Sequence, residues 1–250
     1  MEELAPAELA DQYDAPYFLR LPKPKLTKIG VCIDPTEYNL RQAMKDRVDL
    51  LITHHPWHYI NENLLKKGEM GVYVLHSPWY KAPEGITATL ARLLNLKEVT
   101  HEGEIATGYL EMSFRNLIFC CQRLLQTTIT PYAGDLNAQT HKVLIISGPG
   151  FAPYYRPLWN KYIDQGCDTF LSAELGRFAL SYLTGLKIKL IDLGHSAMAR
   201  PGMEHLAYLL QNRLKVFDCE VCFYPDYHAV NYLTGSFYPE IGTEPEGPFS

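Results

Sequence analysis

Histidines that follow apolar segments are the side chains of this sequence best suited to metal chemistry. His54 and His55 stand in tandem after the apolar run 49–53, and His195 follows a second apolar run and a glycine. Imidazole is a common ligand of zinc and other first-row metals. A tandem pair followed by proline is also suited to shaping a turn, and a single histidine to capping a helix, so both interpretations stay open for each.

The glycine and cysteine motifs indicate structural roles. Residues 147–150 read Ser-Gly-Pro-Gly after an apolar run, but they lack the Lys and Ser/Thr of a P-loop. Cys219 and Cys222 form a CxxC pair without the second pair that zinc needs, and they run into an apolar strand rather than opening a helix. We therefore interpret both motifs as parts of the framework.

The elements that must position the histidines alternate between strand and helix. Strands are expected over residues 28–33, 49–53, 72–75, 142–147, 169–172, 187–193 and 220–224, and helices over 37–47, 84–96, 154–166, 176–184 and 203–214. Residues 117–122 fit either a strand or the start of a helix. This alternation predicts an α/β fold with a parallel or mixed sheet covered by helices. Histidines just past strand ends favour one shared cleft, since ligands bind there in α/β proteins.

Composition and charge exclude several classes of protein. The chain has 250 residues, 47% hydrophobic and 20% charged, with a net charge of −5. It has no clustered basic track for nucleic acid. It has no apolar run of 18 residues and no secretory signal at its start, so we expect neither a membrane span nor export. Six irregularly spaced cysteines fit a reducing compartment, and we expect a cytoplasmic protein.

Five segments together resemble the GTP cyclohydrolase I type 2-like family, also known as the NGG-interacting-factor-three family. They are Tyr13-Asp14, Ile33-Asp34-Pro35-Thr36, the tandem-histidine segment 49–56, Ser172-Ala173-Glu174, and the segment 190–195 that ends at His195. The order of the segments agrees with the family, and the resemblance spans roughly residues 8–226. The tandem-histidine segment is the most specific of the five.

The resemblance implies a three-layer, two-lobed α/β fold with mixed sheets flanked by helices. We expect an N-terminal lobe over residues 1–107 with the tandem histidines, a C-terminal lobe over 108–233 with the late histidine, and a tail over 234–250. The resemblance also implies a ring-shaped homohexamer and a dinuclear metal centre in a cleft. The activity that it implies is that of a metal-dependent hydrolase acting on GTP.

Two acidic ligands of the family are missing from this sequence. The resemblance assigns His54, His55 and His195 as metal ligands, but Tyr80 stands where the family has an aspartate and Ala199 where it has a glutamate. Two cations a few ångströms apart repel each other strongly unless anionic ligands bridge them. We therefore expect at most one divalent ion per chain, zinc or another first-row metal, on the three imidazoles.

The surrounding polar residues leave three hypotheses open. Asp34, Tyr80 and Glu174 are expected to contact a substrate or to support the ligands. The first hypothesis is a divergent metal-dependent hydrolase acting on a nucleotide or a related small molecule. The second is a non-catalytic scaffold or ligand-binding homologue that has lost the dinuclear site. The third is an altered chemistry in which Tyr80 is an acid or a metal ligand.

Overall fold

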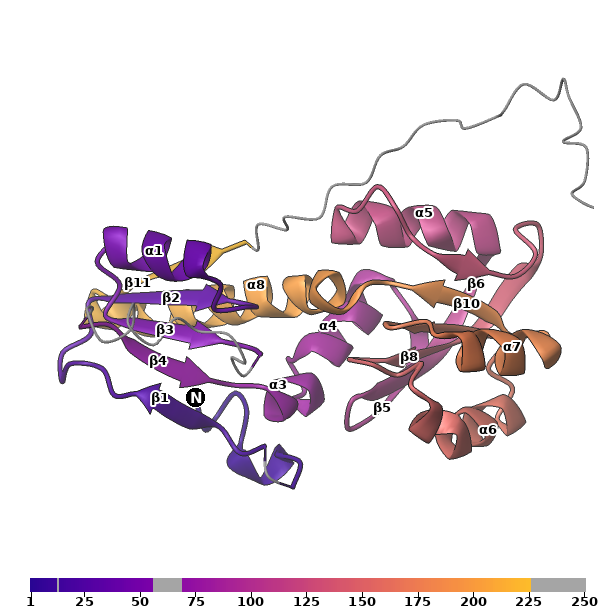
Figure 1. The fold of residues 1–250 in the computed structure, drawn as a ribbon, viewed down its shortest axis with the longest axis horizontal. Coiled ribbons are helices and arrows are strands. Elements are labelled where there is room, and N and C mark those ends of the chain that lie inside the picture. The colour runs from indigo at the N-terminus through magenta and orange to yellow at the C-terminus, as the bar shows by residue number, and fades with distance from the viewer. Residues whose placement is uncertain (13, 56–68, 226–250) are drawn as a thin grey trace, which may run out of the picture.

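Apolar runs alternate with amphipathic segments along this chain and form two mixed β-sheets with helices packed on their faces (Figure 1). The computed structural model describes residues 1–12, 14–55 and 69–225. The two sheets lie side by side along the long axis of the molecule, and helix α8 (His195–Leu214) runs from the second sheet to the first. The predicted fold class, α/β with mixed sheets flanked by helices, is confirmed.

The first sheet has three parallel inner pairings and one antiparallel edge strand. Its order is β1 (Tyr17–Arg20), β4 (Gly71–Val74), β3 (Leu50–Thr53), β2 (Lys28–Cys32) and β11 (Glu220–Tyr224). Helix α1 (Glu37–Lys45) packs on one face, where Cys32 and Leu51 meet Leu40. Val31 and Ile52 point to the other face and join the cluster that contains α8. Burial on both faces explains why β2 and β3 are almost wholly apolar.

The second sheet is also sandwiched between helices. Its order is β5 (Lys97–Glu102), β6 (Ile105–Ser113), β8 (Gln139–Ile146), β9 (Thr169–Ser172), β10 (Lys189–Asp192) and β7 (Tyr132–Ala133). Val143 faces α5 (Phe114–Leu125), whereas its neighbour Leu144 faces Trp159 of α6 (Arg156–Asp164) and Leu183 of α7 (Arg177–Gly185). This alternation along a strand gives each face its own helices.

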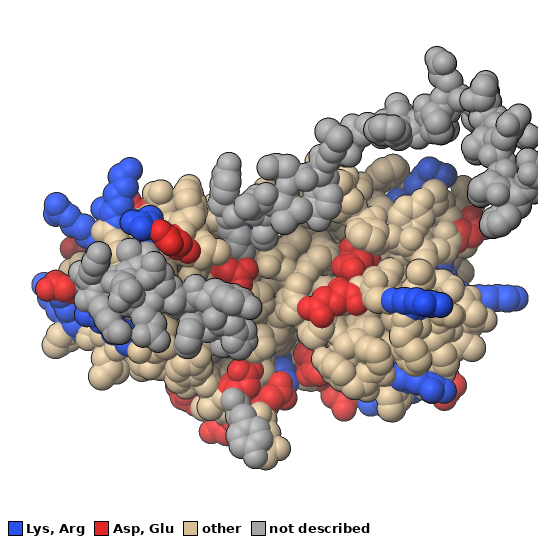
Figure 2. Space-filling view, in the orientation of Figure 1, with Lys and Arg blue, Asp and Glu red and all other residues tan. Residues whose placement is uncertain are grey.

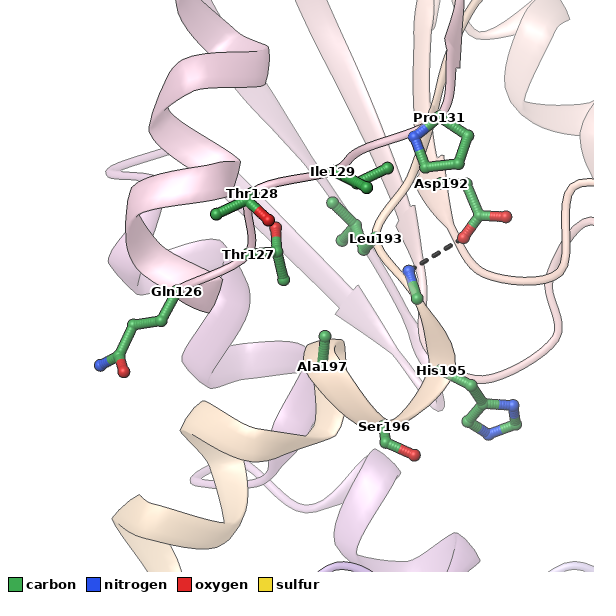
Figure 3. Close-up of a pocket in the computed structure, with 11 residues that line it drawn as sticks. Gln126, Thr127, Thr128, Ile129, Pro131, Asp192, Leu193, His195, Ser196 and Ala197 are labelled. Carbon is green, nitrogen blue, oxygen red and sulfur yellow. Dashed lines mark hydrogen bonds between the residues drawn. The ribbon is translucent and has the colours of Figure 1, made fainter. Parts of the chain in front are cut away.

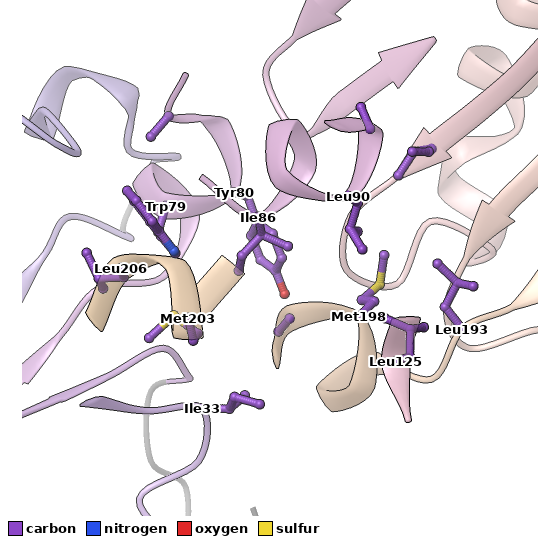
Figure 4. Close-up of a cluster of buried hydrophobic side chains, with 14 of the residues drawn as sticks. Ile33, Trp79, Tyr80, Ile86, Leu90, Leu125, Leu193, Met198, Met203 and Leu206 are labelled. Atoms are coloured by element: carbon purple, nitrogen blue, oxygen red, sulfur yellow. The ribbon is translucent and has the colours of Figure 1, made fainter. Parts of the chain in front are cut away.

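One hydrophobic cluster joins the two sheets. It packs α8 against α3 (Ser77–Lys81) and α4 (Ile86–Leu93), and Figure 4 shows Met203 of α8 near Trp79 and Ile86 of these helices. The cluster also includes Ile52 of the first sheet and Ile145 of the second. Gly202 of α8 faces Ile86 of α4, where an added Cβ would lie 2.5 Å from Ile86 Cγ1. The two helices can therefore approach closely only because residue 202 has no side chain. The described residues also form three short 3-10 helices: η1 (Ala7–Leu9), η2 (Pro153–Tyr155) and η3 (Lys215–Phe217).

Each sheet includes strands from both of the predicted lobe ranges, 1–107 and 108–233. The hairpin of β5 and β6 pairs with β8, so the second sheet already begins at Lys97. Helix α8 then carries the chain back, and β11 pairs with β2 of the first sheet. The whole predicted tail 234–250 lies outside the described residues.

Two helices differ from their predicted bounds. Residues 117–122 belong to a helix, α5, and helix α8 begins at His195 instead of residue 203. Proline lacks the amide hydrogen of a helix interior, yet α8 continues through Pro201. Met198 and Met203 on either side of this proline are fully buried, and their packing holds the helix together.

Two features of the described residues bear on the expected location. Over the ranges 1–12, 14–55 and 69–225, no helix is both long and apolar enough to cross a membrane. All six cysteines are free thiols, including Cys219 and Cys222 at β11.

Candidate metal centre

Two adjacent parallel strands deliver three histidines to one edge of the first sheet. Strand β3 ends at Thr53 and is followed by His54 and His55, while β4 ends at Val74 and is followed, one residue later, by His76. Thr53 and Val74 are register partners, so the segments that follow them lie side by side. His195 arrives from the second sheet, as the first residue of α8 after β10.

The four imidazoles form one cluster. The ring centroid of His54 lies 4.8 Å from that of His55 and 4.9 Å from that of His76, and the His55 and His195 centroids lie 5.0 Å apart. The potential ligand atoms of His54, His55 and His76 all lie within 4.8 Å of one another. These three side chains, from two neighbouring strand ends, could hold a metal ion.

Carboxylates fix the orientation of two of these rings. His55 Nδ1 lies 2.7 Å from Asp34 Oδ1, and His76 Nδ1 lies 2.8 Å from Asp14 Oδ2. An ionised carboxylate only accepts hydrogen bonds, so each Nδ1 carries the proton and donates it, which leaves Nε2 with its lone pair. Burial alone would raise the pKa of Asp14, but the hydrogen bonds from His76 and Ser77 outweigh it and hold the pKa below its usual value. This arrangement is typical of metal-binding histidines.

His54 is the most deeply buried of the four and is oriented by the main chain. Its side chain is 0% exposed, and its Nδ1 lies 3.0 Å from the carbonyl oxygen of Leu75. Burial, with the nearby His55 and His76, holds the pKa of His54 well below its ordinary value, so the ring is neutral at physiological pH. The Nε2 atoms of His54 and His55 are buried and have no hydrogen-bond partner among the described residues. A buried nitrogen lone pair without a partner is costly, and a metal ion would satisfy both.

His195 is engaged on both of its nitrogens. Its Nδ1 lies 2.6 Å from Glu174 Oε1, and its Nε2 lies 3.1 Å from the hydroxyl of Tyr80. Burial is the main reason that the pKa of His195 is lowered and the pKa of Tyr80 is raised. The Tyr80 hydroxyl therefore stays protonated and donates its hydrogen to His195.

The structure brings together every residue predicted for the site. Asp34 binds His55 and also accepts a hydrogen bond from Ser196 at 3.1 Å, while Tyr80 and Glu174 flank His195. Sequence reasoning missed two members of the cluster, His76 and Asp14. His76 directly follows the predicted strand 72–75, as the tandem pair follows its own strand, and the two strands lie side by side in the sheet.

Two further carboxylates, on α8 and at the end of β10, are engaged elsewhere. Glu204 forms an ion pair with Arg200, one turn earlier on the same helix, with 2.8 Å between Glu204 Oε1 and Arg200 Nε. Asp192 accepts hydrogen bonds from the backbone amides of Leu175 and Gly194. Neither side chain takes part in the cluster of ligand atoms.

A pocket of about 560 Å³ adjoins the cluster at the start of α8 (Figure 3). Figure 3 shows Thr127, Thr128, Leu193 and Ala197 gathered on one side of the pocket, while the imidazole of His195 points away from them. The volume falls within the range of small-molecule sites, about 300–1,000 Å³. Residues lining the pocket are Gln126, Thr127, Thr128, Ile129, Pro131, Asp192, Leu193, Gly194, His195, Ser196 and Ala197.

Acidic side chains border the middle of the face seen in Figure 2, where the two sheets meet, and most of the lysines and arginines lie toward its two ends. Three carboxylates, those of Asp14, Asp34 and Glu174, bind histidines of the cluster. Negative charge around a site raises the local concentration of cations. The electrostatic setting therefore suits a metal cation.

Comparisons with known proteins agree with this fold and cover nearly the whole chain. The GTP cyclohydrolase 1 type 2 homolog of Clostridium perfringens (strain 13 / Type A) is 22% identical over 239 residues, which is 86% of this chain and 89% of that protein. The Bacillus cereus protein related to NIF3 has the same fold, with a TM-score of 0.79 at 14% identity, over 94% of this chain and 96% of that one. Reduced HcgD from Methanocaldococcus jannaschii has a TM-score of 0.72 at 22% identity, over 89% and 93%. The model of the Duf34/NIF3 family (NGG1p interacting factor 3) matches residues 1–228, and this chain therefore belongs to that family.

Proposed function

We propose that this chain is a metal-dependent hydrolase that holds one divalent first-row metal ion, such as zinc, on the Nε2 atoms of His54, His55 and His76. The observation that carries the proposal is the pair of buried Nε2 atoms, of His54 and His55, that lack a partner among the described residues. Their Nδ1 atoms are bound to oxygens, so each lone pair is directed into the cluster. Three neutral imidazoles are a known ligand set for catalytic zinc.

A single ion per chain follows from the side chains around the cluster. Tyr80 and Ala199 occupy the positions of the family's two acidic ligands, and both are buried, at 5% and 0% exposure. Asp34 and Asp14 bind Nδ1 atoms on the outer side of the rings. Without a carboxylate to bridge them, a second cation would repel the first.

The bound ion would supply Lewis-acid activation of water and of a polar substrate bond at neutral pH. Residues of the chain orient the ligands and keep them neutral. Asp14 and Asp34 hold two imidazoles in one tautomer, and burial keeps His54 neutral and ready to bind. Relatives named GTP cyclohydrolase 1 type 2 homologs make GTP the first substrate to test.

Elemental analysis of protein purified without chelator tests the metal site. We expect one zinc or other first-row ion per chain in the native protein and little metal in His55→Ala. His141→Gln is the matched control, because this exposed histidine lies outside the cluster and should leave the metal content unchanged. Native protein that stays metal-free after incubation with Zn²⁺ would contradict the proposal.

Turnover of GTP separates the hydrolase from the alternative, a non-catalytic scaffold or ligand-binding homologue. The observation that favours the alternative is the loss of the family's two acidic ligands, whose positions are occupied by Tyr80 and Ala199. Metal-loaded native protein should convert GTP to a ring-opened product on a chromatogram, and His55→Ala should not. Full metal loading without turnover of GTP or other nucleotides would favour the non-catalytic homologue.

We also propose that the chain assembles as a homohexamer, as its resemblance to the family implies, and that it is cytoplasmic, as its irregularly spaced cysteines favour. Light scattering coupled to size-exclusion chromatography should give six times the chain mass of 28.5 kDa. A monomer across the micromolar range would contradict the assembly.

A further inference from the structure

The side chains of Glu174, His195 and Tyr80 are linked by hydrogen bonds at one side of the histidine cluster. Glu174, which follows β9, accepts the Nδ1 hydrogen of His195 at 2.6 Å, and the Tyr80 hydroxyl donates to His195 Nε2 at 3.1 Å. The lone pair of His195 Nε2 therefore already accepts a hydrogen bond from the protein. Its ring lies 5.0 Å from that of His55, yet it is not among the three histidines whose ligand atoms converge.

Tyr80 is held firmly in this position. Its ring centroid lies 4.5 Å from that of His54 and 5.3 Å from that of His76, both in edge-on contacts. The Tyr80 side chain is buried, with 5% of its surface exposed. The neighbouring Trp79 is fully buried and donates to the carbonyl oxygen of Gly202. A phenol packed on these sides cannot swing away from His195 without disturbing the core.

We propose that Tyr80 sets the coordination number of the metal: by occupying His195 Nε2, it leaves three protein ligands and an open position. This inference rests on the proposed function. Zinc sites with three protein ligands bind water or substrate at the fourth position, whereas sites with four protein ligands are closed and structural. Tyr80 is therefore a positioning residue that leaves the fourth coordination position of the metal free for water or substrate.

Tyr80→Phe tests the inference, because it removes the hydroxyl and keeps the ring that packs on His54 and His76. Crystal structures of the Zn²⁺-loaded proteins should show three imidazoles on the metal in the native protein and a fourth, from His195, in the variant. In solution, a chromogenic chelator should remove Zn²⁺ from the variant about 10-fold or more slowly, in the range by which outer partners change metal affinity. The double variant Tyr80→Phe/His195→Gln should return to three imidazoles and native release.

Tyr182→Phe is the matched control, since it removes a half-buried hydroxyl that donates to Asn160 between α7 and α6, away from the histidines, and it should release Zn²⁺ at the native rate. Four imidazoles in the native protein, or three in Tyr80→Phe, would overturn the inference and leave the proposed metal site standing. Native protein that binds no Zn²⁺ would instead overturn the proposed function. In metal-free protein, ¹⁵N NMR of His195 should report an Nε2 atom that accepts a hydrogen bond, and this signal should shift in Tyr80→Phe.

Discussion

At the scale of single residues, the cluster is defined by which nitrogen of each imidazole is already bound. His54, His55, His76 and His195 all have an oxygen acceptor at Nδ1, so they share one tautomer. The difference lies at Nε2: within the described part of the chain, His195 Nε2 accepts a hydrogen bond from the Tyr80 hydroxyl, whereas those of His54 and His55 have no partner. Equal side chains in one cluster can therefore have unequal roles, which depend on a single hydrogen bond.

His76 should be as important for metal binding as the tandem pair. Replacing it by Gln removes one of three converging ligand atoms. We expect a loss of Zn²⁺ affinity larger than the roughly 10–100-fold that follows from changing an outer partner. Competition with a chelator measures the affinity, and His141→Gln provides the control. Native affinity in His76→Gln would show that the third ligand is another residue.

Asp34 should act on the metal through His55. Asp34→Asn keeps the shape of the side chain but weakens the acceptor for the Nδ1 hydrogen of His55, now 2.7 Å away. We expect Zn²⁺ affinity to fall by about 10–100-fold. The exposed Asp164, at the end of α6, gives the matched control in Asp164→Asn. Equal affinities in the two variants would contradict a role for Asp34 in orienting His55.

The sequence predicted the residues of the site whose own motifs are specific, and it missed those that depend on spatial neighbours. His54, His55 and His195 follow strands, and that pattern is local. His76 follows a strand too, but its place beside His54 depends on β4 pairing with β3, which no local pattern reveals. Asp14 reaches His76 across 62 positions of sequence, so its partner is set entirely by the tertiary fold.

At the scale of elements, side chains at strand starts hold the first sheet in register. Asp49, just before β3, accepts hydrogen bonds from the Thr27 amide at 2.7 Å, the Thr27 hydroxyl at 2.8 Å and the Lys28 amide at 3.0 Å. Burial alone would raise the pKa of Asp49, but these hydrogen bonds outweigh it and hold the pKa below its ordinary value. A carboxylate thus ties the start of β3 to the start of β2.

Asp49→Asn should therefore lower the free energy of unfolding in a pH-dependent way. Because the pKa is lowered in the folded state, the stabilisation is complete above the unfolded pKa of about 3.9 and is lost as the pH falls through the folded value. At pH 7 we expect a loss of about 1–3 kcal/mol, the contribution of hydrogen bonds to a charged group. Urea unfolding of both proteins from pH 7 to pH 3 should show the difference shrinking, and a constant difference would contradict it.

The contact of α8 with α4 depends on Gly202. In Gly202→Ala the new Cβ would lie 2.6 Å from the Cα of Ile86, a backbone atom that no rotamer change can move. We expect the free energy of unfolding to fall by about 1–3 kcal/mol, as for other overpacked cores. Gly185→Ala in α7 is the control, because its Cβ would meet nothing within 4 Å. Its expected effect is a stabilisation of up to about 1 kcal/mol, so equal urea midpoints for the two variants would contradict the close packing.

The sequence predicted the ends of helices and strands correctly where the local pattern agreed with the tertiary packing. It predicted them wrongly where the packing extended an element beyond its local pattern. The strand over 169–172 and the strand over 220–224 have the bounds that their apolar runs predict. Helix α8 begins eight residues before its predicted start because the core holds it through Pro201. Its early start matters for the site, since it places His195 and Ser196 at a helix terminus beside Asp34.

At the scale of the whole molecule, the site and the core both join the two sheets. The cluster of buried side chains around α8 includes residues of both sheets, such as Ile52 and Ile145. The hydrogen bonds from Tyr80 to His195 and from Ser196 to Asp34 cross between segments attached to different sheets. A shared core of this kind predicts that the sheets unfold together rather than as independent domains.

Metal binding should therefore stabilise the entire described fold through a local site. An ion that binds only the folded protein, at a free concentration about 1,000 times its Kd, adds about 4 kcal/mol. For a protein of this size, that corresponds to a rise in Tm of roughly 8–16 °C. Differential scanning calorimetry should show one transition without metal and one transition, shifted upward, with Zn²⁺.

The variants that change the site should separate this effect from non-specific stabilisation by Zn²⁺. His76→Gln should unfold in one transition with little shift, whereas His141→Gln should shift as the native protein does. Two transitions, of which only the one carrying the first sheet moves with Zn²⁺, would contradict the coupling. In that case the core around α8 would not transmit the stabilisation gained at His54, His55 and His76 to the second sheet, and the two sheets would behave as separate folding units.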